Sequence, residues 1–557
     1  MGLLVPFQSI PVASPNALAD PEPRRSVVRA APWLLLTLFV LCLLPRALMA
    51  LKISSVCPDG VLYIQLAKSL EQGNLQGGLQ EMRLNTFPVL LLGLHRLGMD
   101  WELAAKVWGV LISSLTILPL FGLARRQFDD RTAIVACLLY AFHAKMIEWS
   151  PELIRDPTFW FLFTLALYLL WRAVSEVRLG FFALGGAAMV LALLTRVEGL
   201  FLLIPLLLWS GWRWFALRRG RGRLVLGVCL ALFACPLLLL LINLTWLRHY
   251  PHWEISRLKP FEIAAVWFQS LGGQTPVVRE GALSTFGPQV RMSTAELWWT
   301  FLHTAEQGLN AVFALLMFAG IWISRRVWLR RDQQALFYMA LAIATGMWIH
   351  LWYIQISSHR YILPVVLIGS VFAAQSVLSL AGWLSRHARW FGLGDDCQGL
   401  ATAALLLAVG GFATSEALAS NYSFRAGEPQ LGRWIQQRFG PSPNLLGSEG
   451  VTAVINYYAQ GDCHLFPFTV TDPAILRMAQ AYRPDVVLLQ VTNHMRRMKT
   501  DRYKLLVDNM RELGLKPVEP SQLPPGCQRL LVLARDVDGR MARAPGAAQR
   551  TPARDTR

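Results

Sequence analysis

The sequence predicts a polytopic α-helical membrane protein with a small α/β domain near its C-terminus, and three observations lead to this fold class. Hydrophobic residues make up 54% of the 557 positions and charged residues only 16%, whereas soluble domains carry about 25% charged residues. Apolar runs of membrane-spanning length recur between residues 33 and 418. After residue 420 they give way to short alternating strand and helix patterns.

Eleven apolar runs are candidate membrane spans, although the runs at 132–147 and 181–195 are short for a bilayer. In chain order, the runs are 33–51, 103–123, 132–147, 158–174, 181–195, 200–217, 224–246, 299–322, 335–354, 361–384 and 399–418. The segment Phe87–Leu97 is also apolar but too short to cross, so we expect an interfacial helix there.

The positions of the arginines relative to these spans predict the topology. Arginines precede the first span and follow spans two, four, six, eight and ten, so they share one side if all eleven spans are real. These residues are Arg24, Arg25, Arg29, Arg125, Arg126, Arg131, Arg172, Arg178, Arg213, Arg218, Arg219, Arg221, Arg223, Arg325, Arg326, Arg330, Arg331, Arg386 and Arg389. By the positive-inside rule this side is cytoplasmic. The rule predicts a cytoplasmic N-terminus and residues 420–557 outside. We expect this multi-pass protein in the plasma (inner) membrane.

This distribution also accounts for the net charge of +18. Because the excess arginines lie in the loops of one side, the charge reflects topology and argues against nucleic-acid binding. We expect four parts: a disordered cytoplasmic tail at 1–32, a transmembrane domain at 33–420, an extracytoplasmic α/β domain at 421–540 and a disordered tail at 541–557.

The α/β domain is predicted from short apolar stretches and amphipathic patterns. The expected buried strands are Asn444–Leu446, Asp485–Leu489 and Arg529–Ala534, and the expected helices are Leu431–Phe439 and Arg502–Leu513. No glycine-rich phosphate-binding loop follows any of these strands. Cys463 and Cys527 could form a disulfide outside the cytosol, but their spacing does not establish the pair.

An acid directly follows the first span, in the stretch Cys57-Pro58-Asp59-Gly60. Pro58 and Asp59 make a good helix start, so on local grounds Asp59 is an N-cap. A carboxylate at the outer edge of a membrane could instead take a proton from a polar acceptor while a lipid-held substrate lies beside it. Tyr63 follows one turn later, where a packing role is expected.

The other loops of the same face also carry acids and arginines next to span ends. Ionisable residues at a membrane edge are costly and therefore suggest function. Acids activate nucleophiles or bind cations, whereas the guanidinium fork suits phosphate. The mixture predicts a lipid-phosphate substrate that meets a hydroxyl or an amine. The residues concerned are Arg83, Arg155, Asp156, Arg196, Glu198, Arg360 and Tyr361.

Five short motifs occur in a fixed order along these loops. They are Asp59 with Tyr63, Phe87-Pro88-Val89-Leu90, Arg155-Asp156-Pro157, Thr195-Arg196-Val197-Glu198-Gly199, and His359-Arg360-Tyr361 with Pro364. Their order and common side resemble the C-type (GT-C) membrane glycosyltransferases. The resemblance is to bacterial relatives of the dolichyl-phosphate-mannose protein mannosyltransferases and of the aminoarabinose transferases. It covers roughly residues 33–420, and a soluble outer C-terminal domain is also common in that family.

The resemblance implies an enzyme that moves a sugar, a hexose or a pentose, from a polyprenyl-phosphate donor to a protein, lipid or glycan acceptor. It implies Asp59 as the general base and Asp156 as a second acid that orients the acceptor or holds a cation. It also implies that Arg360, with Tyr361 and Arg83, binds the donor phosphate. Many relatives have Glu after the first acid, whereas this chain has Gly60.

Three further residues have two open interpretations. Arg196 and Glu198 would line the cavity, or they would form an ion pair that locks a tight turn between two spans. Arg155 would also belong to the cavity, or it would be a helix cap or an interfacial anchor.

The reaction implied by the resemblance is a single displacement at the anomeric carbon, which inverts its configuration if no enzyme nucleophile intervenes. No Cys or His spacing indicates a metal site and no cofactor is assigned, although a divalent cation stays open.

The alternative function is a transporter or flippase of a lipid-linked or anionic solute. Against it, the charged residues cluster at one face and no inverted repeat is visible. A ligand-binding sensor ranks last, because no cytoplasmic part is large enough to relay a signal.

Overall fold

The structure of the protein is a computed structural model. It describes residues 32–74, 86–217, 219–245, 293–325, 339–346, 348, 351, 358–388, 397–419, 423–466, 472–490, 502–527 and 530–535. The predicted tail at 1–32 lies outside the described residues except for its last residue. The tail at 541–557, half of the run at 335–354 and the candidate site residue Arg83 also lie outside them.

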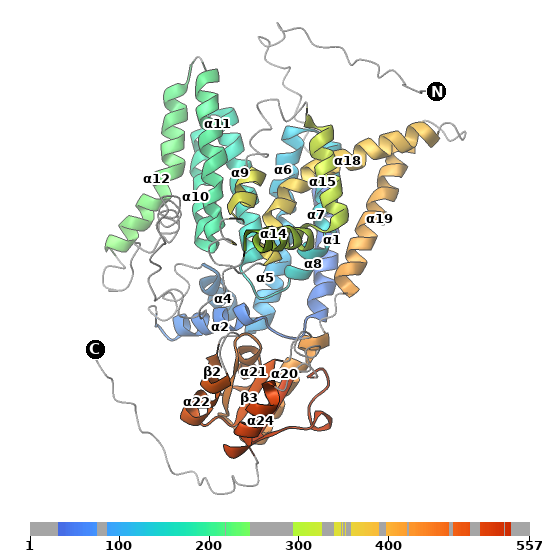
Figure 1. Ribbon diagram of the computed structural model, residues 1–557. Helices are drawn as coiled ribbons and strands as arrows, with labels where there is room; N and C mark the ends of the chain where they lie inside the picture. Colours follow the sequence, from blue (N-terminus) through green and yellow to red (C-terminus); the bar gives the residue numbers. More distant parts are fainter. Residues whose placement is uncertain are drawn as a thin grey trace.

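Most of the described chain is helical, and the helices form the bundle in the upper part of Figure 1. Its main helices are α1 (Pro32–Lys52), α5 (Trp101–Leu115), α6 (Ile117–Gln127), α7 (Asp130–Ala141), α9 (Asp156–Glu176), α10 (Leu179–Thr195), α11 (Leu203–Ala216), α12 (Arg221–Thr245), α14 (Thr294–Leu309), α15 (Ala311–Ile323), α18 (Leu363–Ala388) and α19 (Cys397–Ala419). Within the described residues, six stretches are long and apolar enough to cross a membrane, or seven if the bent pair α14–α15 counts as one. The chain is a multi-pass membrane protein, while the count of eleven spans stays a prediction.

Some of the expected spans are each divided into two helices. The run at 299–322 breaks at Asn310, where α14 and α15 meet at an angle of 94°. Asn310 has a φ of 63°, a conformation that Asn tolerates better than most residues. Its side chain accepts a hydrogen bond from the Val312 amide and so starts α15. The run at 132–147 likewise breaks between α7 and the short helix α8 (Ala144–Trp149).

A buried arginine on another helix explains why α7 ends where it does. Arg46 of α1 is fully buried, and its guanidinium donates to the carbonyls of Tyr140 and Ala141 at 3.3 and 2.7 Å. These carbonyls belong to the last turn of α7, where a helix leaves acceptors without an internal partner. Arg46 also donates to the Ser150 hydroxyl at 3.1 Å, just after α8. A charge inside the first span therefore holds the loop that follows α8.

The helices differ in how deeply they lie in the bundle. In α18, 78% of the most apolar window is buried, whereas in α19 only 6% is. Residues such as Val366, Val371 and Phe372 of α18 belong to the largest hydrophobic cluster. Helix α18 is therefore central, whereas few side chains of α19 are fully buried, and this helix lies at the edge of the bundle (Figure 1).

Two shorter helices lie at the end of the bundle nearest the C-terminal sheet (Figure 1). They are α2 (Pro58–Glu71) and α4 (Thr86–Arg96), and they match the helices expected after Pro58 and over Phe87–Leu97. Tyr63 of α2 is 2% exposed, and its ring meets Phe87 edge-on with a centroid distance of 5.2 Å. The expected packing role of Tyr63 is confirmed.

Residues 423–535 include a five-stranded sheet in the order β2-β1-β3-β5-β4. The elements are α20 (Ser423–Phe439), β1 (Asn444–Ser448), α21 (Val451–Ala459), β2 (Asp462–Phe466), α22 (Asp472–Tyr482), β3 (Val486–Gln490), α24 (Arg502–Glu512), β4 (Leu515–Pro517) and β5 (Leu530–Arg535). Strand β1 pairs in parallel with β2 and β3, and β5 pairs antiparallel with β3 and β4. The three predicted strands and the two predicted helices are present, whereas β2 and β4 are additional.

Alternating side chains of the strands supply two hydrophobic cores, one on each face of the sheet. Leu445 and Val486 belong to the cluster that includes Leu431 of α20 and Ile455 of α21. Their neighbours on the opposite face pack with side chains of α22 and α24. Cys463 and Cys527 are both free thiols, so the disulfide that the sequence left open is not formed in this structure. The domain boundaries at 420 and 540 stay predictions.

Candidate active site

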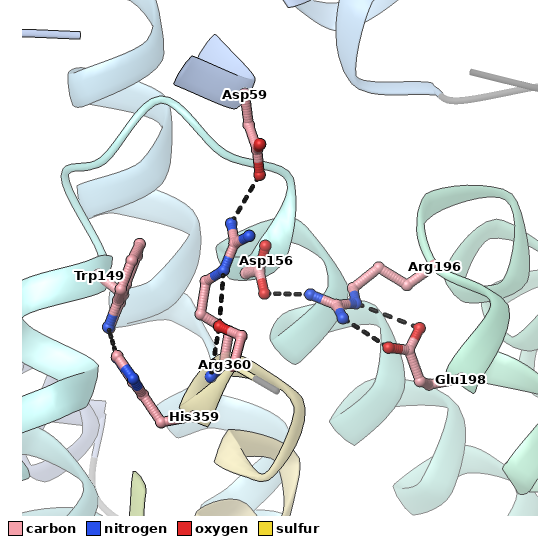
Figure 2. A network of polar contacts seen from close by, with 8 residues as sticks. Asp59, Trp149, Asp156, Arg196, Glu198, His359 and Arg360 are labelled. Atoms are coloured by element: carbon pink, nitrogen blue, oxygen red, sulfur yellow. Dashed lines mark hydrogen bonds and ion pairs between the residues drawn. The ribbon is translucent and has the colours of Figure 1, made fainter. Parts of the chain in front are cut away.

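The candidate residues come from four segments that are distant in sequence and close in space (Figure 2). Asp59 lies in the first turn of α2, and Asp156 is the first residue of α9. Arg196 and Glu198 lie at the turn between α10 and the 3-10 helix Val197–Leu202. Arg360 belongs to the 3-10 helix His359–Tyr361, which leads into α18.

Asp59 does not cap its helix, so the local interpretation of this residue as an N-cap is wrong. The N-cap of α2 is Cys57, Pro58 occupies the first helical turn, and no side chain caps the helix. The Asp59 side chain is 44% exposed, and its Oδ2 accepts a hydrogen bond from Arg360 Nη1 at 2.8 Å. The carboxylate is therefore accessible and faces a guanidinium.

Close packing explains why glycine follows Asp59. A Cβ atom at position 60 would lie 2.7 Å from Val56 Cγ1 and 2.9 Å from Leu153 Cβ. Contacts this short are not tolerated in a close-packed interior. The chain therefore has no room for a second acid directly after Asp59, and α2 rests against the loop between α8 and α9.

Arg360 is held by charge on one side and by an aromatic ring on the other. Burial by itself would lower its pKa, but the carboxylates of Asp156 and Asp59 raise the pKa well above its usual value. The guanidinium lies over the ring of Trp149, 5.2 Å from the centroid. Such stacking is typical of arginines in binding sites.

Trp149 is a site residue that the sequence interpretation missed. Its Nε1–H donates to His359 Nε2 at 2.8 Å, so it supports Arg360 and also fixes the preceding histidine (Figure 2). Burial, and then the charges of Lys145 and Arg360, lower the pKa of His359 to about 4. A neutral His359 can therefore accept this hydrogen bond near neutral pH. The sequence feature that could have identified this residue is a lone Trp in a short loop between two expected spans.

Asp156, Arg196 and Glu198 form a second, buried cluster beside the first (Figure 2). Arg196 Nη1 pairs with Asp156, and Arg196 Nε donates to Glu198 Oε2 at 3.2 Å. The side chains of Arg196 and Asp156 are 6% and 3% exposed. Both interpretations of Arg196 and Glu198 fit this geometry, because the pair locks the turn and also faces the site. Both acids pair with a guanidinium, but the Asp59 side chain is 44% exposed and that of Asp156 only 3%, so Asp59 is the more accessible of the two.

Tyr361 and Arg155 complete the group of predicted residues within the described part of the chain. The guanidinium of Arg196 lies 5.1 Å from the centre of the Tyr361 ring. Burial raises the pKa of Tyr361, so it is a neutral phenol. Arg155 is half-buried at the N-cap position of α9, where its side chain makes no capping hydrogen bond.

The sequence leaves open a divalent cation at the site. Among the described residues, no three His, Cys, Asp or Glu side chains gather closely enough to hold a metal ion. Asp156, which could have held a cation, has the guanidinium of Arg196 as its partner instead. A guanidinium at this place supplies fixed positive charge next to the accessible acid.

Comparisons with known proteins agree with this fold. Residues 87–246 match the family described as dolichyl-phosphate-mannose-protein mannosyltransferase. ArnT from Cupriavidus metallidurans bound to undecaprenyl phosphate has a TM-score of 0.54 and 16% identity, with 91% of this chain and 98% of that chain covered. The Archaeoglobus fulgidus oligosaccharyltransferase in complex with Zn and sulfate has a TM-score of 0.54 and 14% identity, covering 85% and 69%.

A further oligosaccharyltransferase structure from the same organism is also similar. AglB from Archaeoglobus fulgidus, in complex with an inhibitory peptide and a dolichol-phosphate, has a TM-score of 0.51 and 13% identity, covering 88% and 74%. No curated protein sequence matches this chain. The fold is that of the GT-C membrane glycosyltransferases, which confirms the resemblance found in the sequence. Within this class, residues 87–246 carry the pattern of the protein mannosyltransferase family.

Proposed function

We propose that this protein transfers a sugar, a hexose or a pentose, from a polyprenyl-phosphate donor to an acceptor at the extracytoplasmic face of the plasma membrane. One observation carries the proposal: the accessible carboxylate of Asp59 lies 2.8 Å from the guanidinium of Arg360. A base and a phosphate-binding cation are the two groups that such a transfer needs side by side. The bound undecaprenyl phosphate named for the structurally similar ArnT supports the donor class.

In the proposed reaction, Asp59 accepts the proton from an acceptor hydroxyl or amine. The acceptor atom forms a bond to the anomeric carbon while the bond from that carbon to the phosphate oxygen breaks. The electron pair of the broken bond goes to the phosphate, whose charge Arg360 stabilises. No enzyme nucleophile is needed, so the configuration at the anomeric carbon is inverted.

The buried cluster has a supporting role in this proposal. The carboxylate of Asp156 raises the pKa of Arg360 and pairs with Arg196. It therefore favours the positively charged guanidinium groups of both arginines at the place where the phosphate would lie. Tyr361 places its ring under Arg196 and can donate a hydrogen bond, which suits a phosphate oxygen. Arg155 and Arg83 are further candidates for phosphate contacts, the first because it lies at the N-cap position of α9, next to Asp156.

The acceptor is the open part of this proposal, and protein, lipid and glycan hydroxyls or amines all fit the same chemistry. The test is an assay of the purified full-length protein with labelled polyprenyl-phosphate sugars and defined acceptors. Transfer of label with release of polyprenyl phosphate supports the proposal. Movement of an intact lipid-linked sugar across vesicles without cleavage would instead favour the flippase alternative.

A further inference from the structure

Three contacts join the C-terminal α/β region to the segments that precede the two site acids. The Val56 amide donates to the Tyr458 hydroxyl oxygen at 3.1 Å, and the Ser55 hydroxyl donates to Glu428 Oε2 at 2.6 Å. On the other segment, Arg425 Nη1 donates to Glu152 Oε1 at 2.6 Å. Ser55 and Val56 come shortly before Asp59, and Glu152 comes shortly before Asp156, so one region contacts both acid-bearing segments.

Two of these contacts involve charged side chains that are largely buried, those of Arg425 with Glu152 and of Ser55 with Glu428. The Glu152 side chain is 1% exposed and that of Arg425 is 14% exposed. Arg425 Nε also lies 3.9 Å from Glu428 Oε2, so the contacts with the two segments form one network. Charges removed from water are stable only with partners in good geometry, so the network permits few relative positions of the segments.

The two segments also hold each other. Cys57 Sγ donates to the Leu153 carbonyl at 3.3 Å, and the space that Gly60 leaves is filled by Leu153. From the bundle side, Arg46 fixes the same loop through Ser150. The loop between α8 and α9 is therefore held from inside by α1 and from outside by α20.

The held loop follows Trp149, the last residue of α8, whose ring lies under Arg360. A shift of this loop would move Trp149, and a shift of the segment before α2 would move Asp59. The network of Arg425, Glu428 and Tyr458 thus acts on both sides of the Asp59–Arg360 contact. None of these three residues lies in that contact itself.

We infer that Arg425, Glu428 and Tyr458 are positioning residues for the sugar transfer. They align the segment that carries Asp59, the proposed base, with the loop next to Trp149, whose ring supports the phosphate-binding Arg360. The inference rests on the proposed function and goes beyond it by giving the C-terminal region a part in the reaction. A misplacement of about 1 Å can cost about 100-fold in rate.

The test compares single variants of the full-length protein in detergent or nanodiscs. Tyr458→Phe removes only the hydroxyl, which accepts from Val56 and also hydrogen-bonds with Glu102 of α5. Arg425→Met removes the charge, and Arg425→Lys retains it. Arg511→Met is the matched control, because Arg511 is an exposed arginine of the same region, paired with Asp508. Transfer rate, KM for the donor and the thermal midpoint are measured for each, with rates corrected for the folded fraction.

We expect Tyr458→Phe and Arg425→Met to lower kcat by about 10- to 100-fold, with a donor KM within about three-fold of the original. Arg425→Lys should recover part of the loss, and Arg511→Met should behave like the original protein. If Arg425→Met does not fold, Tyr458→Phe decides the outcome, because it loses a single oxygen atom. Normal kcat in Tyr458→Phe and in every folded Arg425 variant overturns the inference.

A second readout does not depend on activity. Amide hydrogen exchange at residues 56–61 and 150–156 should be faster in Tyr458→Phe and Arg425→Met than in Arg511→Met. Unchanged exchange in both segments also overturns the inference. If the original protein transfers no sugar, the proposed function fails, while the exchange data still show whether the C-terminal region holds these segments.

Discussion

Arg360 donates a hydrogen bond to Asp59 at 2.8 Å across 301 positions of sequence. The pair joins the first loop of the chain to the last loop before α18. Each group has a use in glycosyl transfer, the carboxylate as base and the guanidinium as a phosphate ligand. Because Asp59 is 44% exposed, an acceptor can approach the carboxylate without breaking the helix that carries it.

Asp59→Asn should lower sugar transfer by about 10²–10⁴-fold, the usual contribution of a general base. Asn can still accept from Arg360, and α2 keeps its start because Cys57 is the N-cap. Expression and thermal midpoint should therefore stay unchanged. The measurement is transfer from a labelled donor, with Asp508→Asn as an exposed control. Near-full transfer in Asp59→Asn would move the base to another residue, with Asp156 the next candidate.

Arg360→Lys should weaken donor binding about ten-fold or more, because Lys keeps the charge but loses the planar fork and its stacking on Trp149. Arg360→Ala should weaken it further. The measurement is the KM for the donor, or direct binding of polyprenyl phosphate. Arg438→Lys is a matched control, since Arg438 also lies over a tryptophan, 5.4 Å from the Trp434 ring centre. Unaltered donor affinity in Arg360→Ala would remove this residue from the phosphate site.

Arg196→Met should reduce the free energy of unfolding by about 3–5 kcal/mol, because it leaves Asp156 and Glu198 buried without their partner. The measurement is thermal or denaturant unfolding in a fixed detergent. Arg178→Met should cost about 0–1 kcal/mol, since Arg178 is 69% exposed and pairs loosely with Glu176. Equal effects of the two substitutions would show that the buried cluster contributes little to stability.

His359 should make the protein less stable as the pH falls from about 6.5 towards 4. Its pKa is about 4 in the folded protein and about 6.5 in an unfolded chain, so only the unfolded chain binds the proton in this window. At pH 5 the loss should be about 1 kcal/mol after allowance for partial exposure. His359→Gln still accepts from Trp149 but cannot titrate. Comparison of thermal unfolding at pH 7 and pH 5 should show a smaller loss in this variant.

The alternating arginines predict a cytoplasmic N-terminus and an extracytoplasmic C-terminal region. A reporter fused after residue 422 that works only outside the cytoplasm should be active. A reporter that works only in the cytoplasm should be silent at the same position and active when placed after residue 220. Reversed activities at the two positions would invert the topology and place Asp59 on the wrong side for the proposed donor.

Local sequence properties determined the class of the protein. Hydrophobicity is a property of each residue by itself, so the apolar runs were sufficient to indicate a multi-pass membrane protein. The helices α2 and α4 also lie where the sequence predicted them. The short motifs from Asp59 to Tyr361 were sufficient to predict the GT-C fold. The strands β1, β3 and β5 were found because buried strands are apolar, whereas half-exposed β2 and the short β4 were not.

Tertiary structure alone decided how the chain breaks and which charges pair. An apolar run does not reveal that Arg46, on another helix, ends α7, or that Asn310 turns α14 away from α15. Nor does Pro58-Asp59 reveal that its carboxylate leaves the helix end for Arg360. A helix start is a local preference of about 1 kcal/mol. A charge-assisted hydrogen bond to a partly buried arginine is stronger, and it exists only after segments 301 positions apart have packed together.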